Sequence, residues 1–173
     1  MLKRIRNVHS LFYMPLAFLA FPVLGVFFFG YPVWTLGITA AFLLGYLFLV
    51  NFEENPLTNS CWLLMLSYII YMTLCVDGGM MWFTFYFNSL LVFQFQDDYR
   101  SFRFISYDLA MLLMMFVGMT LAEDIATRVM IFLVPVVNYA ILFHWMNARK
   151  NEAQEKAIME KNRTINLLLA ENE

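Results

Sequence analysis

Long apolar stretches separated by short polar segments make up the first 146 residues of the chain. The longest runs without a charged side chain cover residues 11–52, 60–76, 78–96 and 129–148. A helix needs about 20 apolar residues to cross the hydrocarbon layer of a membrane. The pattern therefore predicts an all-α, polytopic membrane protein. Its six transmembrane helices are expected at 11–29, 33–52, 60–76, 80–95, 104–122 and 129–146.

Three of these segments are expected to be irregular. Pro22 lies in the middle of the first and predicts a kink, because proline lacks the backbone N–H that a helix interior needs. The segments 60–76 and 80–95 are short and would each rise only about 24–26 Å as helices. They predict either two spans beside thinned lipid or a hairpin sunk into the membrane.

Basic residues predict the orientation, because short loops rich in Lys and Arg stay in the cytoplasm. Placing both termini in the cytoplasm leaves Arg128 as the only basic residue in an external loop. The expected domains are a basic N-terminus (1–10), a transmembrane sensor domain (11–146) and a cytoplasmic linker (147–173), in a bacterial cell membrane. The predicted membrane-interface anchors are Lys3, Arg4, Arg6, Arg100, Arg103, Trp145, Arg149 and Lys150.

Composition agrees with a membrane protein and excludes several kinds of chemistry. The 173 residues are 62% hydrophobic and 14% charged, with a net charge of -2, whereas soluble domains are about 25% charged. Nucleic-acid binding is not expected, because no basic cluster lies on a soluble domain. The sequence has no catalytic triad, phosphate-binding loop or metal-ligand cluster, so we expect no cofactor or metal in this chain.

The polar C-terminal stretch predicts a helix that continues from the last span without a Gly or Pro break. Glu152 with Lys156 and Glu160 with Arg163 are acid–base pairs at helical spacing. A heptad frame with His144 and Asn151 at position a predicts a weak parallel dimer seam. Its apolar members are Ile158, Ile165 and Leu168. The alternative is a solvated helical tail.

Upstream, the same helix carries residues that could act as a signalling hinge. Pro135 removes one backbone hydrogen bond, and Asn138 follows at mid-membrane depth. His144 lies at the cytoplasmic boundary and is interpreted as an interfacial anchor or a pH-sensitive group. We predict Pro135, Asn138 and His144 as the hinge, with simple packing between helices as the alternative. Asp108 is expected to pair with Arg103.

The stretch EAQEKAIMEKNRTINLLLAENE (152–173) resembles the linker that precedes the phosphorylation helix in DesK-type sensor histidine kinases. In that family a multi-span membrane domain is followed by a two-helix coiled coil. The resemblance implies that the parent protein is a protein histidine kinase, truncated here before its phospho-acceptor histidine. ATP, magnesium and the response regulator would then be bound by the absent kinase core.

The expected function is therefore the sensor and signal-transmission module of a bacterial two-component sensor histidine kinase. Its expected partners are membrane lipids, a second copy of the chain and possible membrane partner proteins. Two other functions stay open: a peptide-pheromone receptor, and a small transporter or permease subunit with polar groups such as Asn88 and Asn138 along its path.

Overall fold

All regular elements that the structure describes are helices. The computed structural model of the chain describes residues 3, 5 and 10–171, and the side chains of residues 11 and 167–171 lie outside the description. In chain order the helices are η1 (Ser10–Phe12), η2 (Met14–Leu19), α1 (Ala20–Phe28), α2 (Thr35–Asn51), α3 (Thr58–Cys75), η3 (Gly78–Thr84), α4 (Phe85–Ser89), η4 (Leu90–Gln94), α5 (Phe102–Leu121) and α6 (Ile125–Glu171).

Three of these helices are long and apolar enough to cross a membrane. They are Thr58–Cys75, Phe102–Leu121 and the part of α6 within Ile125–Asn166, and two shorter apolar helices cover Met14–Phe28 and Thr35–Asn51. The prediction of an all-α membrane protein is confirmed at this level. The count of six spans stays a prediction, because the first, second and fourth segments are shorter or divided.

The first apolar segment changes helix type shortly before its proline. Residues 14–19 form the 3₁₀-helix η2, and α1 begins only at Ala20. Pro22 therefore lies in the first turn of α1, where the backbone N–H groups have no partner within the helix. A proline disturbs the turn that precedes it, so this change of helix type is compatible with the predicted irregularity, and a kink at Pro22 stays a prediction.

The fourth segment is assembled from three short helices of different type. A 3₁₀-helix, η3, is capped by Asp77, whose Oδ1 accepts from the Gly79 N–H at 2.7 Å. The α-helical turn α4 follows, and η4 is a π-helix that closes with the Phe95 N–H donating to the Leu90 carbonyl at 2.9 Å. Such wide turns often occur at functional sites. Gln96 then adopts a left-handed backbone conformation with φ 53°.

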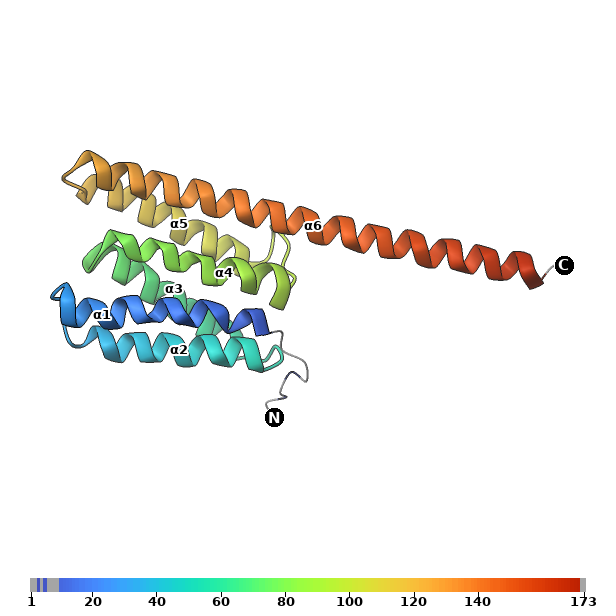
Figure 1. Ribbon diagram of the computed structural model, residues 1–173, viewed down its shortest axis with the longest axis horizontal. Helices are drawn as coiled ribbons and strands as arrows, with labels where there is room; N and C mark the ends of the chain where they lie inside the picture. Colours follow the sequence, from blue (N-terminus) through green and yellow to red (C-terminus); the bar gives the residue numbers. More distant parts are fainter. Residues whose placement is uncertain (1–2, 4, 6–9, 172–173) are drawn as a thin grey trace.

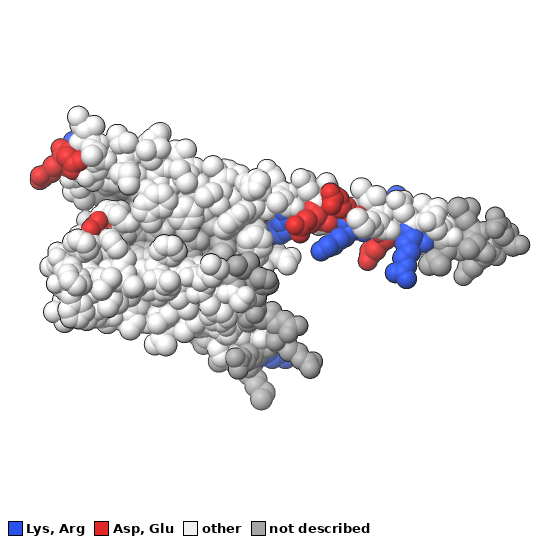
Figure 2. All heavy atoms as spheres, viewed as in Figure 1, with Lys and Arg blue, Asp and Glu red and all other residues white. Residues whose placement is uncertain are grey.

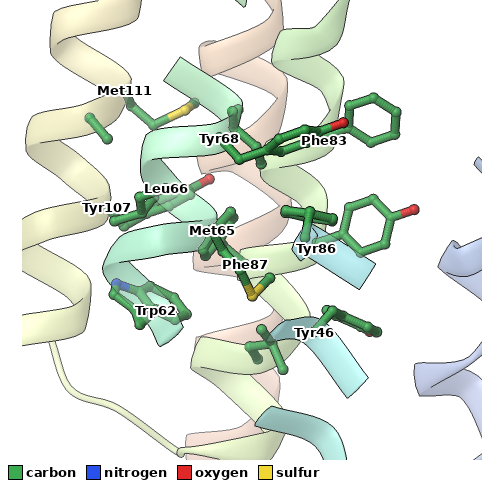
Figure 3. Close-up of a cluster of buried hydrophobic side chains, with 14 of the residues drawn as sticks. Tyr46, Trp62, Met65, Leu66, Tyr68, Phe83, Tyr86, Phe87, Tyr107 and Met111 are labelled. Atoms are coloured by element: carbon green, nitrogen blue, oxygen red, sulfur yellow. The ribbon is translucent and has the colours of Figure 1, made fainter. Parts of the chain in front are cut away.

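Aromatic side chains from α2, α3 and the fourth segment fill the centre of the bundle (Figure 3). The Trp62 ring meets Phe87 edge-on, with centroids 4.6 Å apart at 88°, and Phe42 meets Tyr86 at 5.4 Å and 87°. Edge-to-face pairs stabilise packing by about 0.5–1.5 kcal/mol beyond the area they bury. This core fixes α3 and α4, against which α5 and α6 pack.

Gly25 in α1 provides a specific stability prediction. A Cβ added at Gly25 would lie 2.2 Å from two ring atoms of Tyr31, while the Tyr31 hydroxyl donates to Asp77 across the bundle end. We expect Gly25→Ala to lower the free energy of unfolding by about 1–3 kcal/mol, the usual cost of overpacking. Thermal unfolding in detergent measures this effect.

The matched control is Gly37→Ala in α2, because no atom lies within 4 Å of a Cβ added there. A Gly25→Ala protein that unfolds at the same temperature as Gly37→Ala would contradict the close packing of Tyr31 on α1.

The last helix links the bundle to a projecting rod. α6 has 47 residues and continues through Pro135. Figure 1 shows it lying along the bundle and then extending beyond it, from the end at which the first helical segment begins. On the face shown in Figure 2, charged atoms occur at the two ends of the bundle and along the rod, and the middle of the bundle has none. The predicted continuity of this helix is confirmed.

Candidate functional site

The part of α6 that lies along the bundle has one buried and one exposed face. The buried residues recur every three or four positions, as expected for one face of a helix. They are Ile131, Val134, Pro135, Asn138, Leu142 and Met146. The opposite face is apolar but exposed, and includes Met130, Leu133, Val137 and Ala140. One face is therefore held by the bundle, and the other is available to lipid or to another protein.

A fully buried group of polar side chains holds α6 at mid-depth. This amide cluster consists of Thr84 on η3, Asn88 on α4, Tyr107 on α5 and Asn138 on α6, none of which is exposed. The Asn88 amide donates to Asn138 Oδ1 at 2.6 Å and to the Asn138 carbonyl at 3.2 Å. Tyr107 donates to Asn88 Oδ1 at 2.8 Å, and Asn138 Nδ2 donates to the Thr84 hydroxyl.

The amide cluster joins α6 to both neighbouring helical segments through neutral groups. The Thr84 hydroxyl donates to the Met81 carbonyl at 2.6 Å, so the chain of hydrogen bonds ends on the backbone. Each amide has donors and an acceptor, so it can exchange partners when helices shift, without any change of charge. Buried polar groups must keep partners in a low-dielectric interior, which favours discrete arrangements over gradual sliding.

Asp108 has a different partner from the one the sequence predicts. Its carboxylate accepts a hydrogen bond from the Tyr139 hydroxyl, which lies next to Asn138 on α6. The predicted Asp108–Arg103 pair is wrong. Arg103 lies at the start of α5 and reaches the adjoining loops instead, where other carboxylates are closer.

At the end of the bundle from which the rod projects, a second group surrounds Arg103. This arginine collar consists of Glu54, Asp97, Arg103 and Arg149. The Arg103 guanidinium donates to both Asp97 oxygens, at 2.6 and 3.0 Å, and lies 2.5 Å from Glu54 Oε1. It also covers the Phe95 ring at 4.1 Å. Asp97 is buried, so this bidentate pair fixes the loop between the fourth segment and α5.

Arg149 connects the collar to α6 where the rod begins. Its guanidinium donates to the Val92 carbonyl at 3.0 Å and to the Asp97 carbonyl at 3.4 Å. Val92 belongs to the π-helix, whose wide turn leaves backbone carbonyls with a different direction from those of an α-helix. Beside it, the Lys150 ammonium lies 4.9 Å from the centre of the Tyr99 ring. A rotation of α6 must therefore break or exchange contacts at this point.

The structure separates the remaining predicted site residues. Pro135 is buried, His144 is exposed, and Trp145 packs on Phe93 with centroids 5.4 Å apart. Of the seam residues, Ile158 is 59% and Ile165 47% exposed. Among the predicted anchors, Lys3 and Arg100 are exposed. The side chain of Leu168 and residues Arg4 and Arg6 lie outside the described residues.

Several residues of the amide cluster and the arginine collar were not predicted as site residues. Thr84, Tyr107 and Asp97 have no spacing in the sequence that links them to Asn138 or Arg103. Asn88 and Asn138 are each visible as amides within apolar segments, and that was the one signal that pointed to their pairing.

The described part of the chain contains no group of three or more His, Cys, Asp or Glu side chains that could hold a metal ion. Comparison with protein-family models, curated proteins and solved structures finds no match to the chain. The function of the amide cluster and the arginine collar must therefore be inferred from their geometry.

Proposed function

We propose that this chain is the membrane-embedded sensor and signal-transmission module of a bacterial two-component sensor histidine kinase. The observation that carries the proposal is α6: one unbroken helix is hydrogen-bonded inside the apolar bundle and continues outside it as a charged rod. A rigid helix transmits a shift or rotation along its length. The resemblance of residues 152–173 to DesK-type linkers supports the same function.

In this proposal all six apolar segments cross the membrane, including the two shorter helices and the divided fourth segment. The distribution of charge supports cytoplasmic termini. The end of the bundle from which the rod projects carries Lys3, Arg100, Arg103, Arg149 and Lys150. The opposite turns carry acidic groups, with Arg128 as the single basic residue. Lys and Arg beside membrane spans favour the cytoplasmic side.

The exposed face of α6 supports pairing with a second copy. The heptad frame predicted for the rod continues upstream through α6 in steps of seven residues. Its a and d positions from Met130 to Ile165 are all exposed, both beside the bundle and along the rod. Those beside the bundle are Met130, Leu133, Val137, Ala140 and His144. These exposed a and d residues form one continuous face of α6, along which two copies can pair in parallel from Met130 to Ile165.

Signalling would follow from two arrangements of α6 that a membrane stimulus favours differently. In one arrangement the amide cluster and Arg149 hold α6 as the structure shows. In the other, Asn138 and Arg149 exchange partners, and the rods pair in another register. A weak seam with Asn151 and Gln154 at core positions permits such a change, because polar core residues lower coiled-coil stability. ATP, magnesium and the response regulator belong to a kinase core that residues 1–173 do not contain.

Disulfide crosslinking of single-cysteine variants in membranes tests the pairing. After Cys61 and Cys75 are replaced by alanine, we expect Ile158→Cys and Ile165→Cys to crosslink between copies on mild oxidation. Cysteine at a shared core position of a parallel pair faces its own counterpart.

Lys156→Cys is the matched control, because position 156 lies on the outer face of the same frame. Equal crosslinking at 156 and 158, or none at either isoleucine, would contradict the parallel seam. It would leave the solvated tail as the better description of the rod.

The transporter alternative has less support from the structure. Asn88 and Asn138 bond to one another in a fully buried cluster, so neither faces a path across the membrane. No observation favours the peptide-receptor alternative, which binding of an added peptide to intact cells would reveal.

A further inference from the structure

A long apolar groove separates the N-terminal helix from the fourth segment. Its volume is about 1440 Å³, larger than the roughly 300–1,000 Å³ of typical small-molecule pockets. One wall comes from η2 and α1, including Pro15 and Phe18, and the other from the fourth segment, including Tyr86 and Phe93. Trp145 of α6 closes the end from which the rod projects. Figure 1 shows α4 between α1 and α6 on the face that Figure 2 displays.

The groove stays open because the two walls touch at few points. The Tyr86 hydroxyl donates to the Pro15 carbonyl and forms a bridge at the base of the groove. Phe18, by contrast, leaves 69% of its surface exposed although it lines the groove. The polar groups in the walls are few and neutral, such as Ser89 and Gln94. An apolar chain fits this lining, whereas a charged or strongly hydrated ligand would lose its solvation.

The length of the groove matches an acyl chain. Its wall in the fourth segment extends from Gly79 to Gln94, and these residues rise about 24 Å as a helix. One leaflet of a bilayer occupies half of a hydrocarbon core that is about 30 Å thick. The part of the groove nearer Gln94 is therefore long enough for one chain of a lipid in that leaflet.

The groove ends near Lys3. Ile5 lines it at this end, and backbone hydrogen bonds hold both residues there: the Ile5 N–H donates to the Asn51 carbonyl at 2.8 Å, and the Glu53 N–H donates to the Lys3 carbonyl at 2.9 Å. The first 52 residues contain three basic side chains and no acidic one. Glu53 adjoins Lys3 through its backbone hydrogen bond, and Glu54 is paired with Arg103.

We propose that this groove binds an anionic phospholipid, with one acyl chain along the aromatic walls and the phosphate beside Lys3. The inference requires only that the apolar bundle lies in a bilayer, and it does not depend on the signalling function. If it holds, the lipid also contacts Trp145 of α6, so its headgroup charge can bias the position of that helix.

Fluorescence quenching by brominated lipid tests the proposal on the unmodified chain. The chain is reconstituted in two sets of phosphatidylcholine vesicles. One set contains phosphatidylglycerol with brominated chains, and the other contains phosphatidylcholine with brominated chains at the same mole fraction. We expect brominated phosphatidylglycerol to quench tryptophan fluorescence more strongly, and Trp145→Phe to remove most of the difference. Each basic residue near an anionic headgroup contributes about fivefold to binding, so Lys3→Gln should lower the preference about fivefold. Lys161→Gln on the distant rod is the matched control.

A blocking variant locates the lipid. Ser89→Phe fills the groove wall and should abolish the preference, whereas Ser67→Phe, on the outer face of α3, should retain it. Equal quenching by the two brominated lipids in the unmodified chain would overturn the proposal, as would a preference that Lys3→Gln and Ser89→Phe both leave unchanged. Crosslinking of Ser89→Cys between copies, without quenching by either lipid, would instead show a second copy in the groove and also overturn it.

Discussion

Asp97→Ala is expected to destabilise the bundle more than any other surface-loop substitution. The change removes both acceptors of the bidentate pair and leaves Arg103, which is 14% exposed, with Glu54 and Asn59 as its remaining side-chain partners. Removing one partner of a fully buried pair costs roughly 3–5 kcal/mol. Because Glu54 remains and is itself exposed to solvent, we expect a loss of about 2–3 kcal/mol. Chemical unfolding in detergent measures the difference.

Asp98→Ala is the matched control for this prediction. Asp98 is adjacent and exposed, and its described hydrogen bond is from the Ser101 N–H to its backbone carbonyl, which alanine retains. Equal free energies of unfolding for Asp97→Ala and Asp98→Ala would show that the collar does not hold the loop. They would also contradict a structural connection from Arg149 to α5 through Asp97 and Arg103.

Asn138→Ala is expected to have a smaller effect on stability than Asp97→Ala and a more direct effect on signalling. It removes the acceptor of Asn88 and the donor to Thr84 inside a cluster that solvent does not reach. Hydrogen bonds between membrane helices contribute about 0.6–2 kcal/mol each, so we expect a loss of about 1–2 kcal/mol. Release of α6 should also broaden the set of rod arrangements.

Two comparisons isolate the amide cluster as the cause. Asn166→Ala, on the outer face of the rod in the same heptad frame and exposed, should leave stability unchanged. In a double-mutant cycle, Asn88→Ala and Asn138→Ala should be less costly together than the sum of the single changes, because the two side chains share a hydrogen bond. Full additivity would show that the bond between them contributes nothing.

The sequence contains much of the helical arrangement. Apolar runs bounded by polar turns located α2, α3 and α5 within a few residues, because length and lack of charge are direct requirements of a membrane span. The absence of Gly and Pro between 147 and 171 predicted the continuity of α6 into the rod. These are local properties, which a single chain segment displays by itself.

The irregular elements and the contacts between segments were not predictable in the same way. The 3₁₀ and π turns of the fourth segment depend on packing against α3 and on the Asp77 cap, which no periodicity records. Asp97 follows a residue with left-handed backbone, Gln96, and pairs with Arg103 at the start of α5, an arrangement that no local pattern in the sequence indicates. Asp108 and Asp97 are both near Arg103 in sequence, so position in the chain alone did not identify the partner.

The distance between the two rods tests most directly whether packing inside the bundle controls pairing outside it. A spin label at Ile158→Cys, in a background without Cys61 and Cys75, reports the separation between copies in membranes by pulsed electron resonance. We expect a narrow, short distance distribution in the otherwise unmodified chain and in Asn166→Ala, and a shifted or broader one in Asn138→Ala. Identical distributions in all three, with Asn138→Ala still destabilised, would contradict transmission of a signal through α6.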